Sequence, residues 1–311
     1  MYGIVSAVVP VLLLVVCCVA PVAFVLWLRT RARRGRRSPL TAKLLRGPGT
    51  TLREEIDDAT GNIGAYLAVL AALPLLILAM HLSQSYIGGR PESVLRTTVN
   101  SLFVIGLMLY GSYRLYQDYQ RRFRLTCALD AEIAVAQELD QLMRQGAIAF
   151  HDLPAEEFNI DHVVVTRGGV IAVETKSRLK PDRGGGAEDA TVTFDGQALL
   201  FPGWKDTETL AQTRRQAKWL ARWLTSAAGT TVEVSPVVAL PGWFVDRRAK
   251  SDVRVISGRE AKSLMLGWHG AVVSDEMMNR IAHQLEERCR NVEPVQYGRA
   301  NRLGRLRPER A

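Results

Sequence analysis

The hydrophobic pattern divides the chain into two halves. Long apolar runs dominate the first half, whereas apolar residues in the second half recur at the spacing of strands and amphipathic helices. The runs lie at about residues 4–28, 63–83 and 97–115, near or above the roughly 20 residues that a helix needs to cross a bilayer. We therefore expect three transmembrane helices. The third run is the shortest, and its alternative is a helix that packs against the other two without crossing.

The second half has the pattern of an α/β domain. β-Branched runs separated by turn residues indicate strands, and apolar residues three and four apart indicate helices. The predicted elements are a helix over 125–145 that ends at Gly146, strands over 147–153, 159–166 and 169–176, a hairpin over 191–201, a helix over 207–227, strands over 234–240 and 253–256, and helices within 260–290. This αβββαβ core predicts a mixed sheet flanked by helices.

The positive charge lies in the first half and predicts the membrane topology. Residues 1–124 contain 15 of the 40 Lys and Arg and 6 of the 31 Asp and Glu, and the remaining residues contain 25 of each. Arginine-rich loops stay in the cytoplasm, and clusters follow the first and third runs. We expect a multi-pass protein of the cell membrane with its N-terminus outside and a cytoplasmic domain. A cleaved signal peptide at the N-terminus is the alternative.

Three regions follow from these patterns. Residues 1–124 form the membrane region with a basic cytoplasmic loop at 29–61, residues 125–292 form the soluble domain, and residues 293–311 form an arginine-rich tail. The basic loop suits anionic lipid of the bilayer, with nucleic acid as the alternative ligand.

Three charged residues converge in the predicted hairpin. If Arg167-Gly168 is a two-residue turn, Asp161 lies directly opposite Glu174, and opposed side chains project to one face with Cβ atoms about 4.5–5.5 Å apart. Lys176 joins that face because strand side chains alternate. The alternative is a solvent-facing strand with ordinary charges. However, the strand before Glu174 is apolar on both faces, as in an internal strand.

Two neighbouring carboxylates repel each other unless a cation lies between them. Oxygen ligands suit Mg²⁺ or Mn²⁺, and a nearby lysine can hold a phosphate oxygen or the attacking water. The residues alone thus suggest phosphodiester hydrolysis.

The stretch FNIDHVVVTRGGVIAVETKSR resembles the core of the NERD (nuclease-related) domain, in the PD-(D/E)xK restriction-endonuclease-like superfamily. The resemblance covers about residues 127–240, although alanines stand where the family's opening helix has glycines. It implies a restriction-endonuclease-like fold in which Asp161 and Glu174 bind the metal and Lys176 activates or orients water. It also implies that Glu132 is an additional metal ligand and that Gln212 aligns the phosphate or the lysine.

The sequence leaves more than one function open. The first hypothesis is a membrane-anchored, Mg²⁺-dependent nuclease that hydrolyses DNA or RNA. The second is a non-cleaving, membrane-tethered nucleic-acid-binding or scaffold protein that keeps the nuclease-like fold. A third is that the apolar helices assemble, either as a homo-oligomer or with an unidentified membrane partner, and that the domain responds.

Overall fold

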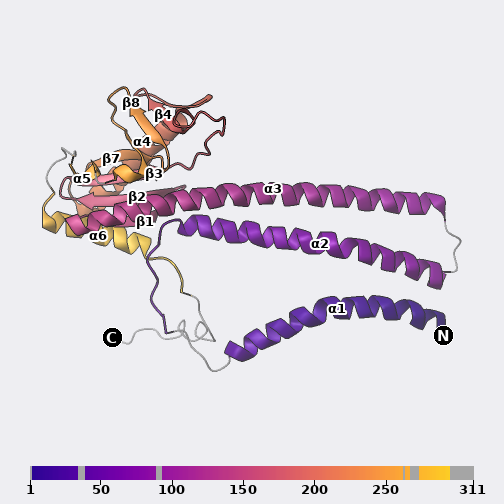
Figure 1. Cartoon of the computed structure of the whole chain (residues 1–311). Helices are drawn as coiled ribbons and strands as arrows, with labels where there is room; N and C mark the ends of the chain where they lie inside the picture. The colour runs from indigo at the N-terminus through magenta and orange to yellow at the C-terminus, as the bar shows by residue number, and fades with distance from the viewer. Residues whose placement is uncertain (1, 34–38, 89–92, 262, 267–272, 295–311) are drawn as a thin grey trace, which may run out of the picture. The chain divides into compact units, whose positions relative to one another are not determined.

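The computed structural model describes residues 2–33, 39–88, 93–261, 263–266 and 273–294 (Figure 1). Contacts divide the chain into two compact units, one of Met1–Ala42, Asp57–Arg122 and Pro294–Ala311, the other of Lys43–Ile56 and Phe123–Glu293. Residues 43–56, part of the basic loop in the sequence analysis, are therefore grouped with the second unit. The arginine-rich tail at 295–311 and loop residues 34–38 lie outside the described residues.

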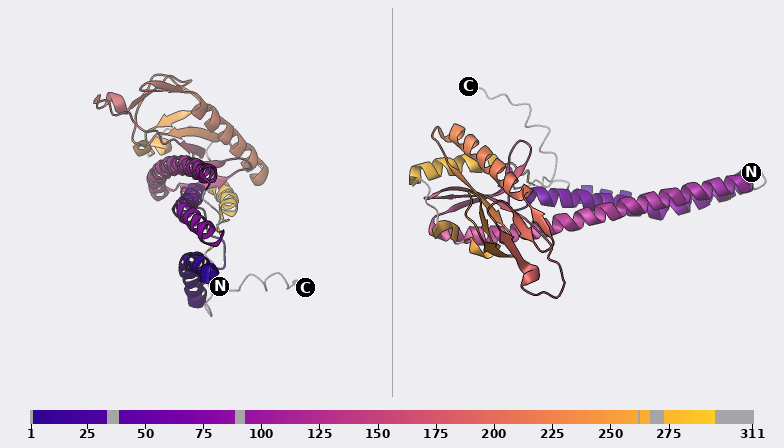
Figure 2. Two further views of the ribbon diagram at one scale, coloured as in Figure 1. Left: turned by 90° about the vertical axis from the view of Figure 1, so that its right-hand side faces the viewer. Right: turned by 90° about the horizontal axis from the view of Figure 1, so that it is seen from above.

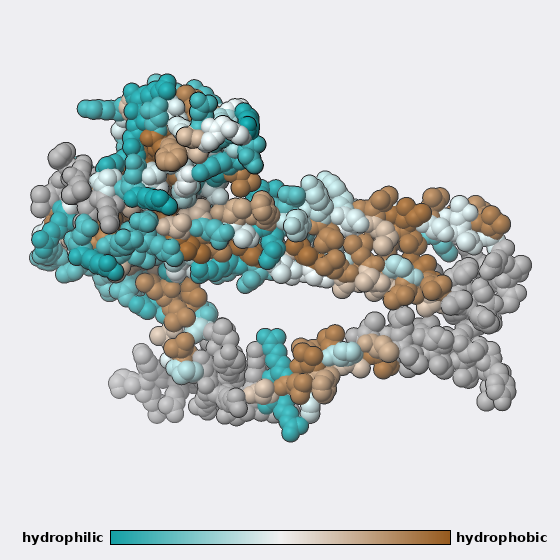
Figure 3. All heavy atoms as spheres, in the orientation of Figure 1, coloured by the Kyte–Doolittle hydropathy of each residue, from teal (hydrophilic) through white to brown (hydrophobic). Residues whose placement is uncertain are grey.

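The apolar runs of the first half lie in three long helices. These are α1 (Tyr2–Arg33), α2 (Thr50–Gly88) and α3 (Val94–Asp140). Apolar side chains gather on the described parts of α2 and α3 (Figure 3), and Leu67, Leu78, Leu102 and Leu109 are among the exposed ones. Within the described residues, one stretch, Thr50–Ala79, is long and apolar enough to span a membrane by length and composition. This is weak support for a membrane association, and it does not support the predicted three crossings or their orientation.

Helix α3 joins two segments that the sequence analysis separates. It runs without interruption through the third apolar run and into the helix predicted to open the domain. The physical reason is that neither Gly nor Pro occurs between Gly111 and Gly146, so nothing breaks the helix. A 3₁₀ helix, η1 (Gln141–Gln145), then ends at Gly146, whose φ of 86° gives the left-handed cap that glycine favours.

A five-stranded mixed sheet forms the centre of the second unit. Its order is β1-β2-β3-β7-β9, in which β2 is antiparallel to both β1 and β3, β7 is parallel to β3, and β9 is parallel to β7. The strands are β1 (Ile148–Pro154), β2 (Asn159–Thr166), β3 (Gly169–Thr175), β7 (Val234–Ala239) and β9 (Arg254–Ile256). Each overlaps a predicted strand. Strand β3 is internal, as its apolar sequence indicates.

Side chains alternate between the two faces of this sheet, and each face packs into its own hydrophobic core. One face packs on α4 (Glu208–Ala228) and α6 (Asp275–Cys289), which lie side by side in both views of Figure 2. Val163 and Ala172 belong to that core, whereas Val164 and Val173 face the other core, which contains Leu139 of α3. The predicted αβββαβ core is thus present as α3, β1, β2, β3, α4 and β7. The mixed α/β fold fits a nuclease-like architecture.

A second sheet of four strands was only partly predicted. Its order is β6-β5-β4-β8, with β4 (Thr191–Phe194), β5 (Leu199–Phe201), β6 (Trp204–Asp206) and β8 (Phe244–Arg247). The hairpin of β4 and β5 is expected from its alternation, but β6 and β8 are too short to give a period. Two further helical segments, η2 (Glu188–Ala190) and η3 (Gly258–Glu260), and the four-residue α5 (Ser263–Leu266) also belong to this unit.

Candidate functional site

The β2–β3 hairpin has the predicted register. Thr166 pairs with Gly169 across the Arg167-Gly168 turn, and the ladder continues to His162 opposite Val173. Asp161 and Glu174 follow this last pair by one residue on each strand. The Oδ2 atom of Asp161 accepts a hydrogen bond of 2.6 Å from the backbone N–H of Thr175. The turn therefore brings the two acidic residues to the same end of the hairpin.

Glu174 is the centre of a buried polar network. Its Oε1 atom lies 2.6 Å from the Nζ atom of Lys176 and accepts a 2.9 Å hydrogen bond from Nε2 of Gln212. Gln212 in turn accepts a 2.9 Å hydrogen bond from Lys176 through its Oε1 atom. On the other oxygen, Glu174 Oε2 accepts a 2.7 Å hydrogen bond from Nε2 of Gln216. Lys176 is thus held between β3 and helix α4 by two acceptors.

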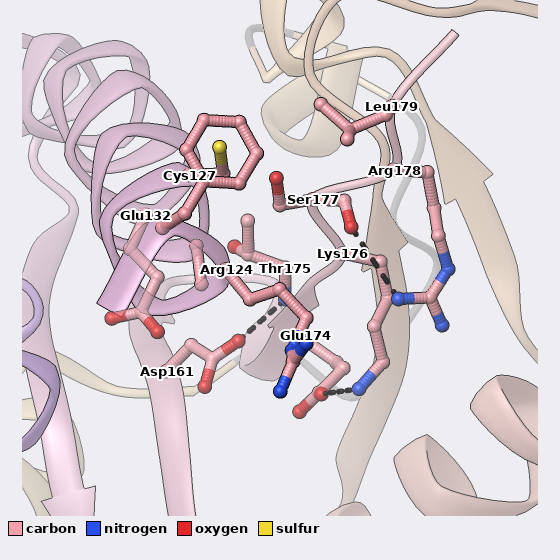
Figure 4. A pocket seen from close by; sticks show the side chains of 12 residues that line it. Arg124, Cys127, Glu132, Asp161, Glu174, Thr175, Lys176, Ser177, Arg178 and Leu179 are labelled. Atoms are coloured by element: carbon pink, nitrogen blue, oxygen red, sulfur yellow. Dashed lines mark hydrogen bonds and ion pairs between the residues drawn. The ribbon is translucent and has the colours of Figure 1, made fainter. Parts of the chain in front are cut away.

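Glu174 and Lys176 line a pocket of about 470 Å³. Figure 4 shows Glu132, Asp161 and Glu174 along its wall, with the Lys176 ammonium beside Glu174. Glu132 comes from α3, Asp161 from β2 and Glu174 from β3. The structure thus brings four of the five predicted site residues to one pocket. The fifth, Gln212, contacts the pocket residues Glu174 and Lys176.

The carboxylates of the pocket disfavour one another's ionisation. Burial, followed by the charges of Glu174 and Glu132, raises the pKa of Asp161 well above its usual value. Burial, followed by the charges of Asp152 and Glu174, raises the pKa of Glu132 from 4.5 to about 7. Lys176 opposes both shifts by its positive charge. The pocket therefore concentrates negative charge that a bound cation would stabilise.

The donor set suits a hard divalent cation. Mg²⁺ is commonly bound by one or two carboxylates and keeps several waters, and the carboxylate oxygens of Asp161 and Glu174 fit that chemistry. Asp161 Oδ2 is engaged by Thr175, whereas its other oxygen has no hydrogen-bond partner among the described residues. In that part of the chain no group of three or more His, Cys, Asp or Glu side chains has the arrangement of a metal site. Metal binding stays a prediction.

A histidine pair supports the hairpin from the opposite face. His162, fully buried, has its Nδ1 atom 2.9 Å from Nδ1 of His151, and its Nε2 atom is 3.2 Å from Oγ1 of Thr175. The Nε2 atom of His151 is 3.0 Å from Asp140. Burial, followed by the charge of His151, lowers the pKa of His162 well below 6.5, so this ring is neutral. His162 therefore packs inside the unit, on the face of the hairpin opposite to Asp161 and Glu174, and its role is structural.

Most of the residues that form this pocket lie in a part of the chain that is similar in sequence to a known protein family. Residues 128–241 match the NERD family model, described as nuclease-related domain. The match extends from the second half of α3 to just past β7 and contains all five predicted site residues. It supports the resemblance seen in the hairpin. No curated protein and no solved structure matched the chain.

Some residues of the site were not among those predicted for it. Gln216 lies one helical turn after Gln212, and its Nε2 atom also donates a 3.2 Å hydrogen bond to the backbone oxygen of Asn159. A polar residue on the apolar face of α4, beside Ala217 and Leu220, is the signal that could have indicated its role. Thr175 contributes its backbone N–H to Asp161, which no sequence pattern indicates. The match places all of these in a nuclease-related region.

Proposed function

We propose that this chain is a membrane-anchored, metal-dependent nuclease that hydrolyses phosphodiester bonds of DNA or RNA. The observation that carries the proposal is the convergence of Asp161, Glu174 and Lys176 at one pocket within a region that matches the nuclease-related domain. Two carboxylates and a lysine, oriented by glutamines of one helix, form a site for a divalent cation and a phosphate. This combination suits hydrolysis of a phosphodiester better than a purely structural role.

The residues of the chain divide the chemistry between them. Asp161 and Glu174 would hold Mg²⁺ or Mn²⁺, with Glu132 as an additional acidic ligand. The bound cation would supply Lewis acidity toward the phosphate and lower the pKa of water. The Lys176 ammonium orients the attacking water or a phosphate oxygen, while Gln212 fixes the lysine. The water oxygen bonds to phosphorus and its proton passes to solvent, one phosphorus–oxygen bond to a sugar breaks, and the leaving oxygen receives a proton from solvent.

A cleavage assay with a charge-matched control tests this proposal. The full chain in detergent micelles is incubated with plasmid, single-stranded DNA and RNA, with Mg²⁺, Mn²⁺ or EDTA. Lys176→Ala removes a charge from the pocket, and Lys250→Ala removes the same charge from an exposed loop residue. We expect divalent-dependent cleavage by the wild type and by Lys250→Ala, and a loss of at least about 100-fold in Lys176→Ala.

The same assay separates the second function. A wild type that binds nucleic acid but cleaves no substrate at any enzyme concentration, with either cation, would favour the non-cleaving nucleic-acid-binding or scaffold protein. Equal cleavage by wild type and Lys176→Ala would contradict the assigned role of the lysine.

We also propose that the first unit crosses the cell membrane three times, with the N-terminus outside and the nuclease-related region in the cytoplasm. The supporting observations are the apolar helices α1 and α2, the apolar first half of α3 and the arginines that follow the first and third runs. A reporter protein that works only in the cytoplasm should be active when it is fused after Ala311. Activity at the same position of a reporter that works only outside the cytoplasm would overturn the topology. Crosslinking of the full chain in the membrane tests whether it assembles into a homo-oligomer.

A further inference from the structure

A segment far from the matched region in sequence belongs to the same compact unit. Residues Lys43–Ile56, which we call the 43–56 segment, are grouped with Phe123–Glu293. Leu44 forms an antiparallel bridge with Val292, with N–O distances of 2.8 and 3.1 Å, and the N–H of Arg46 donates a 3.0 Å hydrogen bond to the carbonyl of Cys289. The segment therefore docks on the end of α6 through its backbone.

A buried ion pair anchors the segment to the main sheet. The Nε and Nη2 atoms of Arg46 lie 3.0 and 2.7 Å from Oδ2 of Asp152 in β1. The side chains are only 10% and 5% exposed, respectively. The same carboxylate accepts hydrogen bonds from the N–H of Thr51 at 2.7 Å and from Nδ2 of Asn159 at 3.0 Å. A carboxylate with this many donors fixes the position of the segment.

Between these contacts of the 43–56 segment, Gly49 lies next to the pocket residue Glu132. Its backbone lies beside the carboxylate of Glu132. A Cβ atom at position 49 would lie 2.2 Å from Cδ1 of Leu129 and 3.5 Å from Oε2 of Glu132. The φ angle of Gly49 is +65°, a backbone conformation that residues other than glycine rarely adopt. Glycine is therefore the residue that permits the close approach of the backbone to helix α3.

We propose that the 43–56 segment is a positioning element of the catalytic pocket, in which Gly49 holds the Glu132 carboxylate and the Arg46–Asp152 pair holds Gly49 in place. The inference rests on the proposed nuclease function and adds residues outside the matched region 128–241 to the site. Gly49 acts through Glu132 and contacts no substrate, so it is a positioning residue. In this role the backbone of Gly49 orients the Glu132 carboxylate in the pocket.

Two glycines of the segment provide a matched experiment. Gly49→Ala forces a Cβ against Leu129, whereas a Cβ at Gly47 meets only the Nη1 atom of Arg53 at 4.0 Å. Both variants are made in the full chain in detergent, and their folding is checked by thermal melting. Mn²⁺ affinity is measured by calorimetry, independently of cleavage. Disturbing an outer partner of a metal ligand weakens metal binding by about 10–100-fold, which we expect for Gly49→Ala and not for Gly47→Ala.

A second background shows whether Gly49 acts through Glu132. In Glu132→Gln, the additional change Gly49→Ala should have little further effect on Mn²⁺ affinity, because the carboxylate that it positions is absent. Cleavage by Gly49→Ala should show a lower kcat with an unchanged KM for nucleic acid. Arg46→Lys should recover part of the Mn²⁺ affinity that Arg46→Ala loses.

The outcomes distinguish this inference from the proposed function. A folded Gly49→Ala that binds Mn²⁺ as tightly as Gly47→Ala would overturn the positioning role and leave the nuclease proposal intact. Equal losses in the wild-type and Glu132→Gln backgrounds would also overturn it, because the effect would then not pass through Glu132. A wild type that binds no Mn²⁺ would end both proposals.

Discussion

The pKa of Glu132 predicts an unusual pH dependence of stability in the absence of divalent cations. Burial, with the charges of Asp152 and Glu174, raises this pKa from 4.5 to about 7. Between these values the folded protein keeps a proton at Glu132 that the unfolded chain has lost. The folded state therefore binds more protons, and the free energy of unfolding falls as the pH rises through this window.

The magnitude follows from the difference between the two pKa values. Each pKa unit corresponds to about 1.4 kcal/mol, so the rise at Glu132 would lower the free energy of unfolding by about 3 kcal/mol between pH 4.5 and 7. The raised pKa of Asp161 acts in the same direction. The Glu132 contribution should be absent in a variant whose side chain at position 132 cannot ionise, and the Asp161 contribution should be smaller there because one of the charges that raise its pKa is missing. A bound cation should reduce both contributions.

Urea unfolding of the full chain in detergent with EDTA, followed by tryptophan fluorescence at pH 5 and pH 8, measures this effect. Glu132→Gln should match the wild type at pH 5 and be more stable at pH 8 by about 3 kcal/mol. Glu138→Gln removes the same charge from the same helix, outside the pocket, and serves as the control. Parallel pH profiles of the wild type and Glu132→Gln would refute the reasoning. Mg²⁺ at pH 8 should stabilise the wild type more than Glu132→Gln.

Three further changes test the packing and the polar network, each by urea unfolding of the full chain. Leu139→Ala, in the core between α3 and the sheet, should lower the free energy of unfolding by about 2–5 kcal/mol, and a loss below about 1 kcal/mol would contradict its burial. Arg46→Ala leaves Asp152 buried without its cation and should cost about 3–5 kcal/mol; an unchanged midpoint would argue against the docked segment. Gln216→Leu removes a donor to Glu174 Oε2 and should cost about 1–3 kcal/mol and slow cleavage, whereas full activity would show that this hydrogen bond is dispensable.

The elements of the second unit were predictable where the pattern is local. The turn at Arg167-Gly168 sets the register of β2 and β3, so the common end of Asp161 and Glu174 follows from counting residues. Helix α4 has a clear apolar face and begins one residue from its predicted start. Strands β6 and β8 were missed because three or four residues, partly exposed, carry no period. The sequence analysis divided α3 into two helices because the chain changes there from apolar to amphipathic. The backbone of α3 nevertheless stays helical throughout.

The roles of Glu132 and Gln212 needed more than local pattern. Both were named only through the family resemblance, because their spacing along helices gives no sign of which side chain they meet. The structure brings Gln212 to Lys176 and Glu132 to the wall of the same pocket.

The sequence alone determined most strands and helices and the pairing within one hairpin, since these depend on residues close together in the chain. Only the tertiary structure decided that Glu132 of α3 lines the pocket, that Gln212 of α4 contacts the pocket residues, and that Gly49 lies beside Glu132 across more than 80 positions. The physical reason is that such contacts arise from the packing of whole elements, and the energy of burying their apolar faces does not appear in any short stretch of sequence.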